Sequence, residues 1–163
     1  MAQAQTPSPA VQAEQYYNQG LAAEKAGDPV AAKKAYSQAL LLNPQHANAR
    51  YRAAELKIEG SAIAAKGREA KFGQEIIPQI VLEGASLQES LDALRLTLEK
   101  VSGPDHVPNF IVQDPEKKLD KARISLQLKG VPAKGVLNYI LTQSGAKATY
   151  DEHAVVIVPQ RGG

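Results

Sequence analysis

Histidine is the side chain best suited to bind a metal or to transfer a proton near neutral pH. The chain has three histidines, His46, His106 and His153, which lie far apart in predicted turns. No two of them have the short helical spacing that places two imidazoles on one metal ion. Because the chain also has no cysteine, the sequence predicts no metal site and no metal ligand.

Asp151, Glu152 and His153 bring carboxylates next to an imidazole, and acid–base catalysis uses these residue types. The three residues are consecutive and stand between two apolar segments, which is typical of a solvated hairpin turn. No arrangement of serine, histidine and aspartate matches a readable hydrolase motif. We therefore predict no catalytic residue and expect that the protein is not an enzyme.

Acidic residues also alternate with lysines between Asp114 and Lys121, in the sequence DPEKKLDK. Asp114, Glu116 and Asp120 supply carboxylates, but a calcium loop needs more oxygen ligands and a glycine at its bend. We expect a solvated, charged turn in this segment.

The segment Lys129–Gly135 (KGVPAKG) places lysines and glycines before a predicted helix. It lacks the order of glycine, lysine and hydroxyl that cradles a phosphate, so no cofactor is predicted. Lys134 and Gly135 are comparable with the clamping loop of a KH nucleic-acid-binding domain. That loop joins two helices, whereas these glycines follow a predicted strand. A KH-like nucleic-acid-binding protein is the alternative function.

Charge is balanced along the 163 residues, and the formal net charge is +2. Up to residue 75 there are 9 basic and 7 acidic residues, and after it there are 10 of each. Neither half has the basic excess that binding to a phosphate backbone needs, which disfavours nucleic acid as a partner. Apolar residues make up 44% of the chain, enough for a packed core, and the lack of cysteine excludes disulfides.

No apolar run approaches the roughly 20 residues that span a bilayer, so no transmembrane segment is predicted. The first ten residues (MAQAQTPSPA) are small and polar, without a hydrophobic signal core. They fit either the start of a mature exported chain, with a signal peptide removed before Ala2, or a cytosolic disordered tail. Residues 1–12 and 160–163 are expected to be flexible tails.

A helical pattern with a recognisable repeat occupies residues 13–58. The stretch YYNQGLAAEKAGDPVAAKKAYSQALLLNP resembles the tetratricopeptide repeat, which is two antiparallel helices in about 34 residues. The positions that carry the resemblance are the early aromatic Tyr16, the close-packing Gly20, the turn Gly27-Asp28, the packing residues Ala32, Tyr36 and Ala39, and the closing Pro44. Gln19 departs from the pattern, which usually has leucine there.

A single repeat cannot bury its own apolar face. We expect the next helix, from about Ala47, to cover that face with Tyr51, Ala54, Leu56 and Ile58. The resemblance implies a surface that binds peptides or partner helices.

Residues 59–75 are predicted to be a linker helix. Gly60, Gly67 and Gly73 each weaken a helix by up to about 1 kcal/mol, so a loose loop is the alternative.

Residues 76–159 read as a βαββαββ domain, with two helices packed on short mixed sheets. A strand with Pro78 near its start is followed by a helix that the capping box Ser86–Glu89 begins. Alternating apolar residues then predict a strand from Ile124, which Gly130 is expected to break. Pro132 and Gly145 are placed to begin and to end the second helix. The predicted class is α+β, with an N-terminal helical hairpin and long helix before this domain.

Three phrases in this region, VLEGASLQESLDALRLTL, ISLQLKGVPAKGVLNYIL and AVVIV, resemble the secretin and TonB N-terminal short domain. Residues 103–108 form an insertion in that pattern. The resemblance implies a periplasmic, outer-membrane-associated protein that binds protein components of a type IV pilus or secretion apparatus. It also implies that edge strands serve for partner binding or for self-association. The leading hypothesis is thus a non-enzymatic adaptor, and a sensor domain of a TonB-type signalling system is a further alternative.

Overall fold

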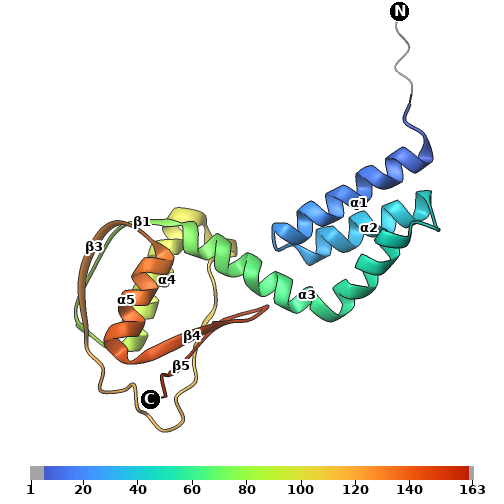
Figure 1. The fold of residues 1–163 in the computed structure, drawn as a ribbon. Helices are drawn as coiled ribbons and strands as arrows, with labels where there is room; N and C mark the ends of the chain where they lie inside the picture. The colour runs from blue at the N-terminus through green and yellow to red at the C-terminus, as the bar shows by residue number, and fades with distance from the viewer. Residues whose placement is uncertain (1–5, 162–163) are drawn as a thin grey trace, which may run out of the picture. The chain divides into compact units, whose positions relative to one another are not determined.

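The computed structural model describes residues 6–161 and shows an α+β protein (Figure 1). The chain divides into two compact units, Met1–Gly67 (unit 1) and Arg68–Gly163 (unit 2). The predicted cleavage site before Ala2 lies outside the described residues. Among the described residues, no helix combines the length and the apolar character needed to cross a membrane.

Unit 1 is helical. It contains α1 (Pro9–Lys25), α2 (Pro29–Leu42) and the first part of α3 (Ala47–Gln74). Ser8 and Asp28 cap α1 and α2, because their side chains accept hydrogen bonds from the N–H groups of Val11 and Ala31. A proline follows each cap at the first helical position, where its missing N–H has no helical partner to lose. Helix therefore begins at Pro9, within the range 1–12 that the sequence suggested as a tail.

Small residues let the helices of unit 1 approach closely. A Cβ atom on Gly20 would lie 2.3 Å from Cε1 of Tyr36, so this glycine makes room for the buried aromatic ring. Gly27, at φ +77°, lies against Gly67 of α3, where a Cβ atom would come within 2.5 Å of the Gly27 carbonyl oxygen. Gly67 was expected only to weaken a helix, and here it is the point at which α3 meets the turn between α1 and α2.

Helix α3 is continuous from Ala47 to Gln74, so the loop alternative for residues 59–75 is wrong. Its last turns belong to unit 2, where Phe72 is only 3% exposed. The Phe72 ring packs edge-on against Phe110, with 5.8 Å between the ring centroids.

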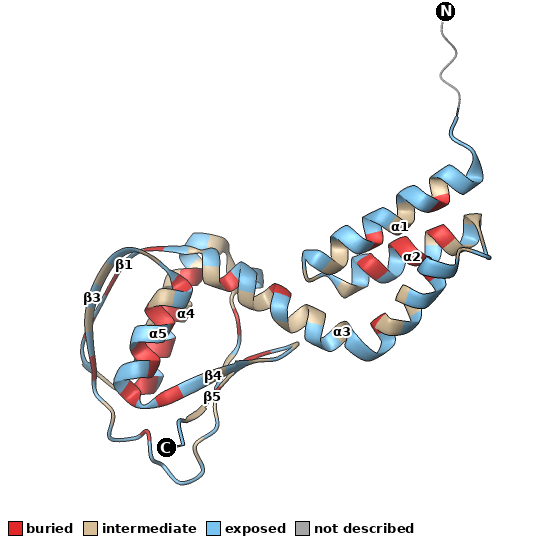
Figure 2. Ribbon diagram, viewed as in Figure 1, coloured by how far each residue is buried: buried red, intermediate tan, exposed pale blue. Residues whose placement is uncertain are grey.

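Unit 2 has the predicted element order, with one short 3₁₀ turn added in the 103–108 insertion. The elements are β1 (Ile76–Ala85), α4 (Leu87–Ser102), the 3₁₀ turn η1 (Pro104–His106), β2 (Phe110–Val112), β3 (Ile124–Pro132), α5 (Ala133–Ser144), β4 (Ala146–Tyr150) and β5 (Val155–Pro159). Strands β1 and β3 form an antiparallel pair, and the second sheet has the order β2-β5-β4. Figure 1 shows α4 and α5 between the two sheets, and both helices carry buried residues (Figure 2).

Local sequence signals explain how the helices of unit 2 begin and end. The capping box is present, since Ser86 Oγ accepts from the Glu89 N–H and Glu89 Oε2 accepts from the Ser86 N–H. Gly145 ends α5 in the left-handed conformation, as predicted. The expected break at Gly130 is wrong, because β3 continues to Pro132. Gly130 stays in the strand at φ +65°, a conformation that glycine adopts without steric cost.

Candidate protein-binding surface

Helix α3 has two opposite faces within unit 1. One face packs against the α1–α2 hairpin, and its residues recur at spacings of three and four. They are Ala49, Ala53, Leu56, Gly60, Ile63 and Gly67. On a helix with 100° per residue, the opposite face carries Tyr51, Ala54, Ile58 and Ala62, and all four are exposed. We call these four residues the α3 stripe.

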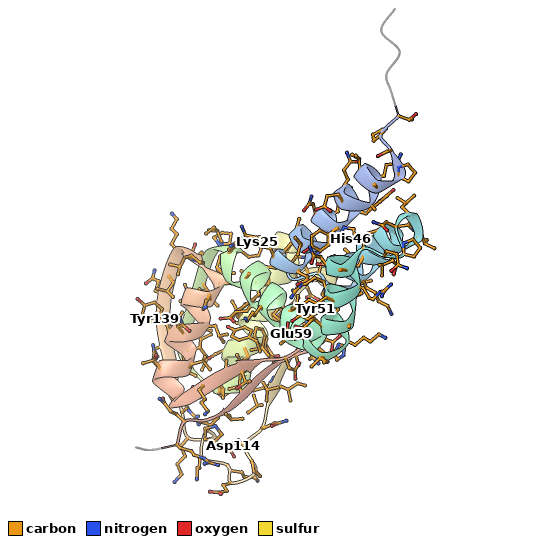
Figure 3. All side chains as sticks on the ribbon, turned by 45° about the vertical axis from the view of Figure 1, so that its right-hand side comes forward. Lys25, His46, Tyr51, Glu59, Asp114 and Tyr139 are labelled. Atoms are coloured by element: carbon orange, nitrogen blue, oxygen red, sulfur yellow. The ribbon has the colours of Figure 1, made fainter. Side chains whose placement is uncertain are left out.

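The α3 stripe corrects the expectation that Tyr51, Ala54, Leu56 and Ile58 together cover the hairpin. Leu56 does so and is 8% exposed, whereas Tyr51 is 61% and Ile58 is 81% exposed. Alanine or glycine stands at four of the six packing-face positions, and at Gly67 the helix closely approaches the Gly27 turn. The larger apolar side chains of the opposite face, Tyr51 and Ile58, lie in solvent, and Figure 3 labels Tyr51 on this helix.

A partly buried polar network holds α3 to the hairpin. The Tyr36 hydroxyl donates to Glu24 Oε1 at 2.5 Å, and Arg52 Nε of α3 donates to the same oxygen at 3.2 Å. A second Arg52 nitrogen pairs with Glu24 Oε2. Burial, and then the hydrogen bond to Glu24, raise the pKa of Tyr36 above its usual range, and the same carboxylate raises the pKa of Arg52. The network joins all three helices and so fixes the orientation of the α3 stripe.

His46 has a structural role at the start of α3. Its Nδ1 accepts from the Ala49 N–H at 3.2 Å, as an N-cap side chain does. That contact leaves the ring proton on Nε2, which donates to Glu14 Oε2 at 2.9 Å. The ring also packs on Tyr17, with 5.0 Å between the centroids.

The other predicted turn residues do not gather into a site. His106 ends the 3₁₀ turn η1 and is exposed. Asp151 lies in the turn between β4 and β5, where it accepts from the N–H groups of His153 and Ala154, and these bonds hold the pKa of its carboxyl below the usual value. Within residues 6–161, no three side chains of the types that ligate metals lie close enough together to hold an ion.

The acidic segment at Asp114 is a turn, as expected. The two Asp114 carboxylate oxygens accept from the N–H groups of Lys118 and Leu119 at 3.0 and 2.7 Å. The Lys118 ammonium lies 2.6 Å from Glu116. An open hollow of about 530 Å³ adjoins this turn and is lined by Asp114, Pro115, Glu116, Lys118, Lys147, Val158, Pro159, Gln160 and Arg161. The carboxylates of this hollow are thus already bonded to neighbouring groups.

The lysines and glycines of the KH comparison do not form a loop between two helices. Gly130 lies in β3, and Lys134 and Gly135 lie in the first turn of α5. The Lys134 ammonium is 2.7 Å from Glu69 Oε1 near the end of α3. The nucleic-acid-binding alternative stays a prediction.

Comparison with protein families places a known repeat in unit 1. The tetratricopeptide repeat matches residues 13–46, which cover most of α1, all of α2 and the residues up to the start of α3. No curated protein and no solved structure matches the chain. The match confirms the tetratricopeptide-type helical module predicted from the sequence and supports a role in protein–protein interaction.

Proposed function

We propose that this protein is a non-enzymatic adaptor whose α3 stripe binds the helical surface of another protein. One observation carries the proposal: four apolar side chains are exposed in a row on the face of α3 that points away from its own hairpin. Repeats of this type bury such faces by stacking against a neighbouring helix pair. The repeat matches at residues 13–46, and in this proposal a partner protein takes the place of the neighbouring helix pair.

The shape of the α3 stripe favours a helical partner. From Tyr51 to Ala62 it extends for about 16 Å at 1.5 Å per residue, which is three helical turns. A narrow apolar row of this length fits the apolar face of one amphipathic helix, whose side chains pack into the spaces between Tyr51 and Ile58.

The resemblance of residues 76–159 to the secretin and TonB N-terminal short domain supports a more specific proposal. In it, the adaptor works in the periplasm, associated with the outer membrane, and its partners are components of a type IV pilus or secretion apparatus. The βαββαββ order and the position of both helices between two small sheets are compatible with this proposal. The resemblance supports a TonB-type sensor domain equally well. The tetratricopeptide module, however, gives that alternative no support.

The binding proposal is tested with two matched charge substitutions in the full chain. Ile58→Asp places a carboxylate in the α3 stripe, and Val30→Asp does the same at a comparably exposed position on α2. We expect proteins captured from cell-envelope extracts by the wild-type chain to be retained by Val30→Asp and lost with Ile58→Asp. Equal capture by both variants would contradict the role of the α3 stripe.

The compartment and the KH-like alternative are tested separately. Fractionation of cells that carry the native gene should find the protein with periplasmic and outer-membrane markers. Recovery from the cytosol, together with RNA homopolymer binding that weakens steeply with salt, would favour the nucleic-acid-binding alternative.

A further inference from the structure

Among the described residues, no strand pairs with the outer edge of β4, where Ala148 and Tyr150 are half-buried and Ala146 is buried. Gln160 N–H donates to the Gly145 carbonyl and Asp151 N–H to the Ala154 carbonyl, at the two ends of the β4–β5 pair. Antiparallel pairs alternate, so Lys147 and Thr149 also direct their backbone groups at β5. The N–H and C=O groups of Ala146, Ala148 and Tyr150 therefore point away from β5, to the side where β4 is the outermost strand.

The other sheet edges of unit 2 are interrupted or short. At the outer edge of β3, the Gln143 side chain accepts from the Ser125 N–H and donates to the Ser125 carbonyl, both at 2.9 Å. Strand β1 contains Pro78, which has no N–H. Strand β2 has only three residues. Thus β4 is the edge best able to accept another strand.

We propose that a second copy of this chain binds here, with the two β4 strands antiparallel and a two-fold axis passing beside Ala148. This register pairs Ala148 with Ala148 of the second copy, and Ala146 with Tyr150 of the second copy. Each of these pairs is of the hydrogen-bonded kind, so the register uses all three outward-pointing residues of both strands. The two three-stranded sheets then join into one of six strands.

The side chains of β4 are self-complementary in this register. The exposed Lys147 stands opposite Thr149 of the second copy, so the two lysines are not directly opposed. They are diagonal neighbours, about 7–8 Å apart at the backbone. On the inward face, the small Ala146 meets the large Tyr150 of the second copy, which is a complementary match of volumes. A shift of the register by two residues would lose hydrogen bonds. It would also bring either the two lysines or the two Thr149 side chains opposite each other.

Opposite charges at position 149 test the register. Thr149→Glu places a carboxylate opposite each Lys147 of the dimer, and Thr149→Lys places an ammonium there. By sedimentation of the full chain at up to about 1 mM, where small interfaces associate, we expect a concentration-dependent dimer. Its Kd should fall about fivefold for Thr149→Glu and rise about fivefold for Thr149→Lys, because each dimer contains two such pairs. A monomer at all concentrations, or a dimer with the same Kd in both variants, would overturn the proposal.

A single cysteine gives an independent test, since the chain has none of its own. Hydrogen-bonded pairs have Cα atoms about 5.5 Å apart, which a disulfide can bridge. Oxidised Ala148→Cys should therefore form a covalent dimer, whereas Gln127→Cys, on the exposed face of β3, should not. Ala148→Pro removes an N–H that β5 does not use, so it should abolish the dimer while leaving the circular dichroism spectrum and the unfolding midpoint near those of wild type. Equal cross-linking at both cysteines, or a dimer that survives Ala148→Pro, would count against this edge.

Discussion

Pro78 of β1 stands opposite Gly130 of β3, and at this pair both strands exchange the face that they turn to the core. The two residues lie between the registered pairs Ile77–Val131 and Gln79–Lys129. The core-facing pairs are Ile77–Val131 on one side and Ile80–Leu128 and Leu82–Leu126 on the other. In both strands, the alternation of core-facing and solvent-facing residues therefore shifts by one residue at this point. The pairing register between the two strands does not change. The positive φ of Gly130 makes this change of face possible.

Substitution of Gly130 by alanine should destabilise unit 2 through the backbone alone. Nothing lies within 4 Å of a Cβ atom at this position, so the cost comes from the left-handed φ of +65°. We expect Gly130→Ala to lower the free energy of unfolding by about 1–2 kcal/mol, measured by urea denaturation. Lys129→Ala next to it is the control, with a change within about 0.5 kcal/mol. If Lys129→Ala lowered the free energy of unfolding by the same amount, the positive φ of Gly130 would not be the cause.

The contact between Gly27 and Gly67 predicts opposite results for two glycines of α3. Gly67→Ala should destabilise unit 1 by about 1–3 kcal/mol, because the new methyl group meets the Gly27 backbone. Gly60→Ala has space, with the nearest atom at 3.7 Å, and should stabilise the helix by up to about 1 kcal/mol. Thermal unfolding of the two variants measures the difference. Stabilisation by both substitutions would show that helix propensity, rather than the close approach, decides the outcome.

The tyrosines make stability depend on pH at alkaline values. Folding raises the pKa of Tyr36 above its usual value near 10, so above pH 10 the unfolded chain loses this proton first and stability falls as pH rises. Burial and the nearby Glu69 raise the pKa of Tyr150 to about 12, with the same sign.

Tyr36→Phe separates these contributions. The variant should lose about 1–2 kcal/mol at pH 7, because the hydroxyl no longer donates to Glu24. Its further decline between pH 10 and 11 should be shallower than that of wild type, measured as urea midpoints at each pH. Identical slopes would contradict a raised Tyr36 pKa.

Gln143 should protect the edge of β3. Replacing it by alanine removes both hydrogen bonds to Ser125, which should cost about 1 kcal/mol and speed hydrogen exchange of the Ser125 amide. Gln127→Ala serves as the comparison. The Gln127 side chain is exposed and, among the described residues, makes no hydrogen bond to the backbone at the outer edge of β3. If the hydrogen-exchange rate of the Ser125 amide is unchanged in Gln143→Ala, Gln143 does not protect this edge.

Short-range signals predicted most of the elements correctly. The capping box at Ser86, the left-handed Gly145 and the tetratricopeptide positions around Gly20 and Tyr36 each depend on residues a few positions away, or on one neighbouring helix. The exposed α3 stripe was mistaken for a packing face, although the spacing of Ala49, Ala53, Leu56 and Gly60 carried the opposite signal. The prediction placed the large apolar residues Tyr51 and Ile58 against the hairpin. Where two helices pack closely, small residues are favoured at the contact.

The sequence by itself determined the element order, the repeat in unit 1 and the absence of cysteine chemistry, because these follow from residue types and local periodicity. Only the tertiary structure decided that Gly67 meets Gly27, that Phe72 enters the core of unit 2 and that Gly130 continues a strand. Each of these outcomes depends on a partner far away in the chain. Periodicity reports which residues share a face, but the neighbour that covers that face is set by packing.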